Sequence, residues 1–274
     1  MSPIFDVTSQ DGTHIAVIDE GSGQPILIVH PGGGDARSWS RVARGLASRF
    51  RVLRFDRRPY RTPGGVAPDA TMANEVNDVV AIAKAVGDPV LLVGHSSGAV
   101  VALEAALASP SSFAGMALYE PPVTVNKPLG GEALARAEAA LKAGKPGLAM
   151  KIHLLDIVKA PRLQVQLLSL FPPIWRQVTE YAAGQITDSR NLESLGVGID
   201  RYAPLTVPAL LIGGARSPRH LGARLAALRG VLPEVDSVSI LERQGHLANA
   251  FAPDRLADII GAFADRVFAP PTSE

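Results

Sequence analysis

The chain has 274 residues, of which 47% are apolar and 19% are charged, and this balance is typical of a folded globular protein rather than a disordered or fibrous one. Its formal net charge of +1 gives no electrostatic reason to expect a nucleic-acid or acidic-membrane partner. The absence of cysteine excludes disulfides, thiolate metal sites and a cysteine nucleophile.

The N-terminal segment lacks the features of a targeting sequence. The first basic residue is Arg37, so no positively charged segment precedes an apolar stretch. No apolar run reaches the roughly 18 residues that a membrane-spanning helix needs. We therefore expect a cytoplasmic protein without a nucleic-acid or membrane partner, present as a monomer or a homodimer.

The first part of the chain alternates between short β-rich runs and segments of helical periodicity. The runs that start at Pro25 and Pro89 are apolar on both faces, which is typical of buried strands. A β-α-β series of this kind predicts a parallel sheet with right-handed crossovers. The predicted strands are 13–19, 25–30, 51–56, 89–94 and 113–119, and the predicted helices are 38–49, 71–86 with Thr71 as N-cap, and 97–108, with a Pro- and Gly-rich loop over 59–68.

The character of the sequence changes between residues 121 and 204, where no convincing strand occurs. After this stretch the alternation of strands and helices resumes. The simplest account is a single domain over 1–274, in which a helical insertion (121–204) interrupts a core formed by 1–120 and 205–274. The predicted helices of the insertion are 132–143, 148–158 and 174–183, followed by strands 208–214 and 236–241 and helices 221–232 and 254–268.

The sequence Gly94-His95-Ser96-Ser97-Gly98 matches the nucleophile-elbow pattern G-x-S-x-G. The pattern is short and therefore weak evidence by itself. It lies between a predicted buried strand and a predicted helix, which is the context that a nucleophile elbow requires. A sharp turn would hold Ser96 in a strained conformation, and the two glycines would let the strand and the helix pack closely. The N-terminus of the helix also favours negative charge near Ser96. This context predicts nucleophilic chemistry at Ser96.

Two further segments complete a resemblance to the α/β-hydrolase family that covers nearly the whole chain. His30-Pro31-Gly32-Gly33-Gly34 directly follows a strand and is similar to the oxyanion loop of that family, with Pro31 where glycine is usual. Gly245-His246 lies between the last predicted strand and the last predicted helix, where the family keeps its catalytic histidine. The chain order serine, acid, histidine is then available.

The resemblance implies an α/β-hydrolase fold, a mostly parallel eight-stranded sheet flanked by helices with a helical lid inserted after strand six. It implies Ser96 as nucleophile, His246 as base, and an oxyanion hole formed by backbone N–H groups of Ser97 and of Gly32 or Gly33. It implies neither a cofactor nor a metal, and no P-loop, dinucleotide fingerprint or metal-binding motif occurs in the sequence.

The acid of the triad needs separate reasoning. Most members of the family carry it after the strand that is here 208–214, but no Asp or Glu occurs from Arg201 through Pro233. A known variation in the family places the acid after the preceding strand, where this sequence has Glu120. The ends of neighbouring parallel strands lie at one rim of the sheet, within reach of an imidazole there. We therefore predict Glu120 as the acid, with Asp200 and Asp56 as alternatives; an ion pair with an arginine would make Glu120 structural instead.

The apolar side chains of the insertion predict a small apolar or aromatic substrate. Trp175, Phe171 and Leu154 are the predicted substrate-binding residues, although most apolar residues of the insertion must pack it onto the core. The segment Arg57-Arg58-Pro59-Tyr60-Arg61 departs from the Gly-rich sequence of many relatives, and we interpret it as an altered pocket wall.

These residues predict a cofactor-independent serine hydrolase that cleaves a small apolar carboxylic ester, lactone or thioester through an acyl-enzyme on Ser96. One alternative is a lyase or another non-hydrolytic enzyme of the same fold that uses the triad as a general base. A second is a non-catalytic ligand receptor, which has no need of the Ser96–His246 pair. We expect structural roles for His95 and for His30, the latter through hydrogen bonds to loop backbone.

Overall fold

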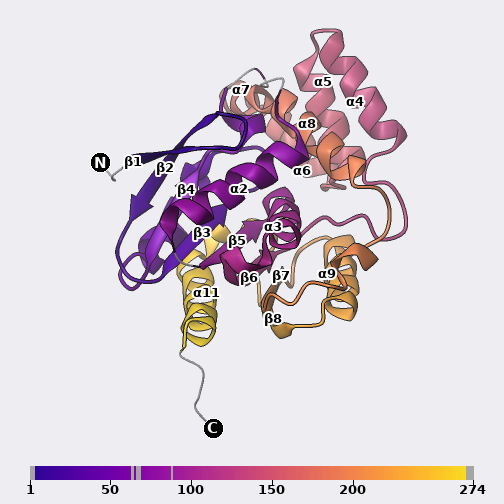
Figure 1. The fold of residues 1–274 in the computed structure, drawn as a ribbon. Coiled ribbons are helices and arrows are strands. Elements are labelled where there is room, and N and C mark those ends of the chain that lie inside the picture. Colours follow the sequence, from indigo (N-terminus) through magenta and orange to yellow (C-terminus); the bar gives the residue numbers. More distant parts are fainter. Residues whose placement is uncertain (1–3, 63–64, 66–68, 88, 270–274) are drawn as a thin grey trace.

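The computed structural model of the protein describes residues 4–62, 65, 69–87 and 89–269. Its strands are β1 (Ile4–Thr8), β2 (His14–Glu20), β3 (Pro25–Val29), β4 (Arg51–Phe55), β5 (Val90–His95), β6 (Phe113–Tyr119), β7 (Ala209–Gly214) and β8 (Val235–Leu241). In this described part the strands form one eight-stranded sheet in the order β1-β2-β4-β3-β5-β6-β7-β8 (Figure 1). β2 pairs antiparallel with β1 and β4, and all other neighbours run parallel. The predicted mostly parallel sheet is confirmed, and β1 is the one described strand without a counterpart among the predicted strands.

Helices cover both faces of the sheet, and the alternation of side chains along each strand divides the core in two. Leu27 and Val29 of β3 belong to one half, and Ile26 and Ile28 belong to the other. All four side chains are buried, and each contributes about 1.5–3 kcal/mol to folding. Two-sided burial explains why this strand is apolar throughout. The first half lies under α2 (Met72–Val86), α3 (Ser97–Ala108) and α9 (Arg219–Val231), and the second under α1 (Ser40–Leu46) and α11 (Pro253–Val267).

Short helices connect these elements, and a side-chain cap marks the start of α2. Thr71 is the N-cap of α2, as predicted, since its Oγ1 accepts a hydrogen bond from the Asn74 N–H (3.3 Å). Residues 63–64 and 66–68 of the predicted loop 59–68 lie outside the described residues. The short helices are η1 (Ala36–Trp39), η2 (Arg58–Tyr60), η3 (Pro110–Ser112), η5 (Asp200–Tyr202) and α10 (Ala248–Phe251).

Between β6 and β7 the chain forms a group of helices, called here the insertion helices. They gather at one end of the molecule in Figure 1. They share a small apolar core of their own, to which Leu134, Ile157 and Ile186 contribute. The insertion helices are α4 (Glu132–Lys142), α5 (Pro146–Ile152), the π-helical turn η4 (His153–Ile157), α6 (Arg162–Ser169), α7 (Pro172–Glu180) and α8 (Ala182–Ser194).

The observed insertion helices differ from the predicted ones in two respects. The helix predicted over 148–158 is present as α5 and η4, but its C-terminal half is π-helical, since the Val158 N–H bonds the His153 carbonyl (2.9 Å), five residues back. α6 and most of α8 were not predicted: α6 buries only Val165, and the buried face of α8 includes polar residues such as Asp188, so hydrophobic periodicity does not reveal either helix. No helix within the described ranges combines the length and the apolar character that crossing a bilayer requires.

His153 gives the stability of the protein a predictable dependence on pH. The ring is buried in η4, 3.4 Å from Ser189 Oγ, and burial lowers its pKa from 6.5 to about 4 against the opposing effect of the Asp188 charge. Between these two values the folded state binds fewer protons than the unfolded state, so stability falls as the pH falls. Between pH 7 and pH 5 the unfolding free energy of the wild type should fall by about 2 kcal/mol more than that of His153→Gln. Urea denaturation of both proteins at the two pH values measures this difference. Equal losses in the two proteins would show that His153 is not held neutral.

Candidate active site

Ser96 lies in the sharp turn between β5 and α3. Its φ of +53° and ψ of −126° fall in a region that L-residues rarely adopt, so the surrounding structure must hold this strained backbone. The flanking glycines are required for space. A Cβ on Gly94 would lie 2.4 Å from Ala99 Cα, and a Cβ on Gly98 would lie 2.4 Å from the His30 carbonyl oxygen. The G-x-S-x-G pattern therefore corresponds to a tight strand–turn–helix with Ser96 at its apex.

Backbone hydrogen bonds fix the Ser96 turn on both sides. The Ser96 N–H donates to the Tyr119 carbonyl of the neighbouring strand (2.8 Å), and the Ser96 carbonyl accepts from the Ala99 N–H (2.9 Å). Because α3 begins at Ser97, the N–H groups of its first turn have no acceptor within the helix. The Ser97 N–H is one of them, and this helix end favours negative charge beside Ser96.

Glu120 and His246, predicted as acid and base, are in direct contact. Glu120 Oε2 lies 2.6 Å from His246 Nδ1, and Glu120 Oε1 accepts a hydrogen bond from the Gly214 N–H at the end of β7 (2.8 Å). The carboxylate is 2% exposed, and Glu120 has a positive φ of +47°, so its backbone is strained like that of Ser96. An Nδ1–H that donates to this carboxylate leaves His246 Nε2 with a free lone pair.

Tyr119 connects the histidine loop to the nucleophile turn. Its hydroxyl donates to the Gly245 carbonyl and accepts from the Ala248 N–H (3.2 Å), which holds the loop on both sides of His246. The Tyr119 ring stacks on His95 with 4.4 Å between centroids, and the His95 ring lies 4.8 Å from that of His246. Since His95 directly precedes Ser96, the base lies beside the nucleophile turn. His95 itself is fully buried and accepts a hydrogen bond from Trp39 Nε1 (3.3 Å).

The glycine loop after β3 starts against the first turn of α3, and His30 holds its beginning. His30 Nδ1–H donates to the Pro31 carbonyl (2.7 Å), and Nε2 accepts from the Arg57 N–H (3.0 Å). Burial, together with the Arg57 charge, lowers the pKa of His30 to about 4, so the ring is neutral, as this pair of bonds requires. Gly33 has a φ of +76°, which glycine adopts without strain. His30 thus bonds the loop backbone, as predicted.

Sequence comparison identifies the family. The model of the alpha/beta hydrolase family matches residues 26–259, which is most of the chain. The chain belongs to the α/β hydrolase family.

Individual relatives and solved structures are similar over much of this α/β hydrolase. The structure of an α/β hydrolase from Sphaerobacter thermophilus is 28% identical and has a TM-score of 0.82, covering 95% of this chain and 100% of that one. A thermophilic esterase from Thermogutta terrifontis has a TM-score of 0.75 over 98% of this chain and 100% of that one; at 21% identity this likeness shows the fold alone.

Two curated proteins are also similar. The putative carbamate hydrolase RutD of Azorhizobium caulinodans is 24% identical over 265 residues, which is 90% of this chain and 93% of that protein. The uncharacterized hydrolase YraK of Bacillus subtilis is 32% identical over 120 residues, which is 40% of this chain and 42% of that protein. The match therefore spans less than half of YraK.

The alternative acids of this α/β hydrolase lie in other contacts. Asp56 Oδ1 accepts a hydrogen bond from the Ala36 N–H (2.8 Å) and holds the turn before α1. Asp200 is exposed at the start of η5. Of the three carboxylates considered, only Glu120 contacts His246 within the described structure.

Of the predicted substrate-binding residues, Trp175 lies on α7, Leu154 lies on η4, and Phe171 directly precedes α7. Trp175 packs against α5, where the Lys151 Nζ lies 5.7 Å from the centre of its ring. Phe171 is 57% exposed, and Leu154 is half-buried in η4. The structure thus groups these three residues in one part of the molecule, and the contacts described above for them do not include Ser96.

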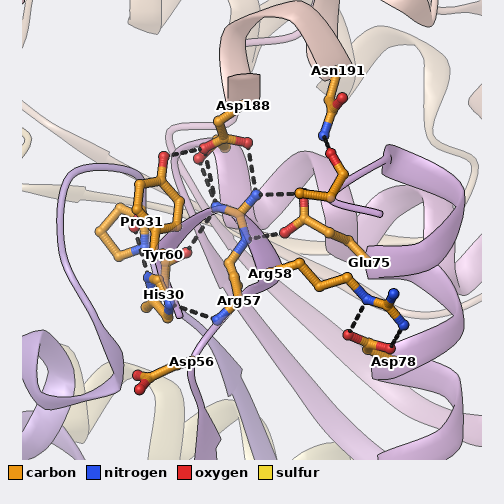
Figure 2. A network of polar contacts seen from close by, with 12 residues as sticks. His30, Pro31, Asp56, Arg57, Arg58, Tyr60, Glu75, Asp78, Asp188 and Asn191 are labelled. Atoms are coloured by element: carbon orange, nitrogen blue, oxygen red, sulfur yellow. Dashed lines mark hydrogen bonds and ion pairs between the residues drawn. The ribbon is translucent and has the colours of Figure 1, made fainter. Parts of the chain in front are cut away.

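The segment 57–61 forms a buried ion-pair network (Figure 2). Arg57 binds Glu75 and Asp188, and Arg58 binds Asp78. The interpretation of this segment as a pocket wall is wrong for Arg57 and Arg58, since each is only 1% exposed. Sequence reasoning missed these roles because the partner carboxylates come from α2 and α8, in one case 131 positions away. The one feature of the sequence that could have indicated this network is the pair of adjacent arginines directly after a mostly apolar strand.

Proposed function

We propose that this α/β hydrolase is a serine hydrolase that cleaves small carboxylic esters, lactones or thioesters through an acyl-enzyme on Ser96. The observation that carries the proposal is the 2.6 Å contact between Glu120 Oε2 and His246 Nδ1, beside a serine in a strained strand–helix turn. A histidine oriented by a buried carboxylate is the arrangement that activates a serine hydroxyl.

In the proposed mechanism, Ser96 Oγ attacks the substrate carbonyl carbon while its proton passes to His246 Nε2. Glu120 holds the imidazole in the Nδ1–H tautomer and stabilises the imidazolium. The carbonyl electron pair moves to oxygen, and N–H groups of Ser97 and of the glycine loop, Gly32 or Gly33, stabilise the oxyanion. As the tetrahedral intermediate collapses, the bond to the leaving group breaks and His246 returns the proton to it. A water then attacks the acyl-enzyme with His246 again as base, and the carboxylic acid is released.

We further propose that the insertion helices act as a lid over this site. Their apolar side chains, among them Leu154, Phe171 and Trp175, favour small apolar or aromatic acyl groups over charged ones. The proposed enzyme needs no cofactor and works as a monomer or homodimer in the cytoplasm.

A carbamate is the second candidate substrate. The relative from Azorhizobium caulinodans, similar over 90% of this chain, is described as a putative carbamate hydrolase. The same nucleophile and oxyanion donors would serve, because a carbamate also reacts through a tetrahedral intermediate at a carbonyl carbon.

Turnover of a panel of p-nitrophenyl esters from acetate to decanoate, with a benzoate and an N-alkyl carbamate, tests the proposal. We expect turnover of short or aromatic esters that disappears in Ser96→Ala, and incorporation of one heavy oxygen from labelled water into the acid product. Preference for the carbamate would favour the second candidate. No turnover of any member by the folded protein, or equal turnover by Ser96→Ala, would contradict serine hydrolysis, and product without labelled oxygen would indicate non-hydrolytic chemistry.

A further inference from the structure

Arg57 is a buried connection between the insertion helices and the two backbone segments proposed to form the oxyanion hole (Figure 2). Its Nη1 donates to Ser97 Oγ (2.8 Å) and, more weakly, to the His30 carbonyl (3.3 Å). The other side of the guanidinium binds Asp188 of α8, with 2.7 Å from Nη2 to Oδ1 and 3.2 Å from Nη1 to Oδ2. Glu75 of α2 accepts from Nε (2.8 Å) and Nη2 (3.2 Å). Every N–H group of the guanidinium therefore has an acceptor, and its orientation is fixed.

α8 contacts the core through a face that is polar and tightly packed. A Cβ on Gly184 would lie 2.3 Å from the Pro59 carbonyl oxygen, so glycine permits the close approach. One turn later Asp188, fully buried, accepts from the Tyr60 hydroxyl (2.7 Å), and Asn191 Nδ2 donates to the Ala70 carbonyl (2.9 Å). These three residues share one helix face. Asp188 is thus the point at which α8 contacts the Arg57 guanidinium.

Two carboxylates share the single charge of Arg57, and they differ in pKa. Burial alone would raise the pKa of Asp188, but the Arg57 charge and hydrogen bonds from Arg57, Ser97 and Tyr60 hold it below its usual value. Burial raises the pKa of Glu75 to about 7, with the Asp188 charge adding to the effect. Asp188 is therefore the ionised partner throughout the neutral range. If its charge is removed, Glu75 can ionise in its place, so a neutral substitution at position 188 leaves Arg57 with a counter-ion.

We propose that Asp188 is a positioning residue for the oxyanion hole: by binding Arg57 it fixes Ser97 at the start of α3 and the His30 carbonyl at the start of the glycine loop. This inference rests on the proposed function. Both segments carry proposed oxyanion donors, and Arg57 spans them. Looser orientation of Arg57 would shift the donors relative to each other, which weakens transition-state stabilisation more than substrate binding.

The matched comparison is Asp188→Asn against Asp78→Asn. Asp78 is also fully buried and binds an arginine of the same segment, with 2.6 and 2.8 Å to Arg58, but it bonds neither Ser97 nor His30. In Asp188→Asn, Arg57 still has Glu75 as a partner, and in Asp78→Asn, Arg58 still has Asp11. The measurements are kcat and KM on the best ester of the panel, thermal unfolding, and the Ki of a trifluoromethyl ketone. Ser96 Oγ attacks the carbonyl carbon of this ketone, and the serine proton moves to His246. The carbonyl oxygen of the adduct becomes an oxyanion that occupies the oxyanion hole.

We expect Asp188→Asn to lower kcat by about 10-fold or more, to leave KM within about twofold, and to raise the ketone Ki by the same factor as kcat falls. Asp78→Asn should keep kcat and Ki within about twofold of the wild type, whatever its unfolding temperature. Equal changes in the two variants, or a rise in KM alone, would overturn the inference.

A milder variant covers the case in which Asp188→Asn does not fold. Tyr60→Phe removes one hydrogen bond to Asp188 and leaves all charges in place, and it should change kcat and Ki in the same direction by a smaller factor. An unchanged kcat and Ki in Tyr60→Phe would then overturn the inference. A folded wild type that neither hydrolyses the esters nor binds the ketone would instead refute the proposed function, and the positioning role with it.

Discussion

The Ser96→Ala variant is expected to hydrolyse p-nitrophenyl esters about 10⁶-fold more slowly than the wild type, with a residual rate about 10³–10⁴-fold above the rate without enzyme. The proposed acyl-enzyme cannot form without Oγ, and the remaining oxyanion donors and His246 only assist direct attack by water. Initial rates under saturating substrate measure this loss.

The control is Ser109→Ala at the opposite end of α3, where Ser109 Oγ forms a hydrogen bond with Ser112 Oγ (2.8 Å). This variant should keep full activity, and both variants should unfold close to the wild-type temperature. Ser96→Ala with more than about a tenth of wild-type activity would exclude Ser96 as the nucleophile.

The Glu120→Gln variant is expected to lower kcat by about 10³–10⁴-fold with the fold intact. The geometry gives the reason. Because the Gly214 N–H needs an acceptor, the amide oxygen of glutamine should take the place of Oε1, and the NH₂ group would then face His246 Nδ1. The imidazole would be held with its proton on Nε2, where it cannot accept the proton of Ser96.

Asp200→Asn is the matched control, because Asp200 was an alternative acid and is exposed. Its kcat should equal that of the wild type, and circular dichroism should show that both variants fold. A large loss in Asp200→Asn, together with near wild-type activity in Glu120→Gln, would move the acid to the end of the insertion.

The contact between Glu120 and His246 could be predicted from an absence in the sequence, together with the resemblance to relatives that carry the acid after the preceding strand. The end of β7, where most relatives keep the acid, approaches the histidine loop so closely that a Cβ on Gly214 would lie 2.8 Å from Gly245 Cα. The backbone there donates to Glu120 instead of supplying a carboxylate. A carboxylate at a strand end and a serine in a strand–turn–helix are local features, which sequence patterns reveal.

The Arg57 network could not be predicted, because its members are polar residues on helices far apart in the chain. Asp188 lies on a helix whose buried face carries Gly184, Ser189 and Asn191 as well, so no apolar periodicity indicates that the face is buried. Two adjacent arginines are usually solvated, and only the meeting of α2, α8 and the segment 57–61 shows that these two are buried. Which insertion helix contacts the core therefore required the structure.

Labelling with a fluorophosphonate, followed by mass spectrometry of the intact protein and of its peptides, tests the nucleophile most directly. The phosphonyl group should attach once per chain, on the peptide that contains Ser96, with loss of fluoride. Labelling should be absent in Ser96→Ala and much slower in Glu120→Gln, because the same histidine must accept the serine proton. An adduct on any other residue, or no adduct on the folded wild-type protein, would contradict the assignment of Ser96 as the nucleophile.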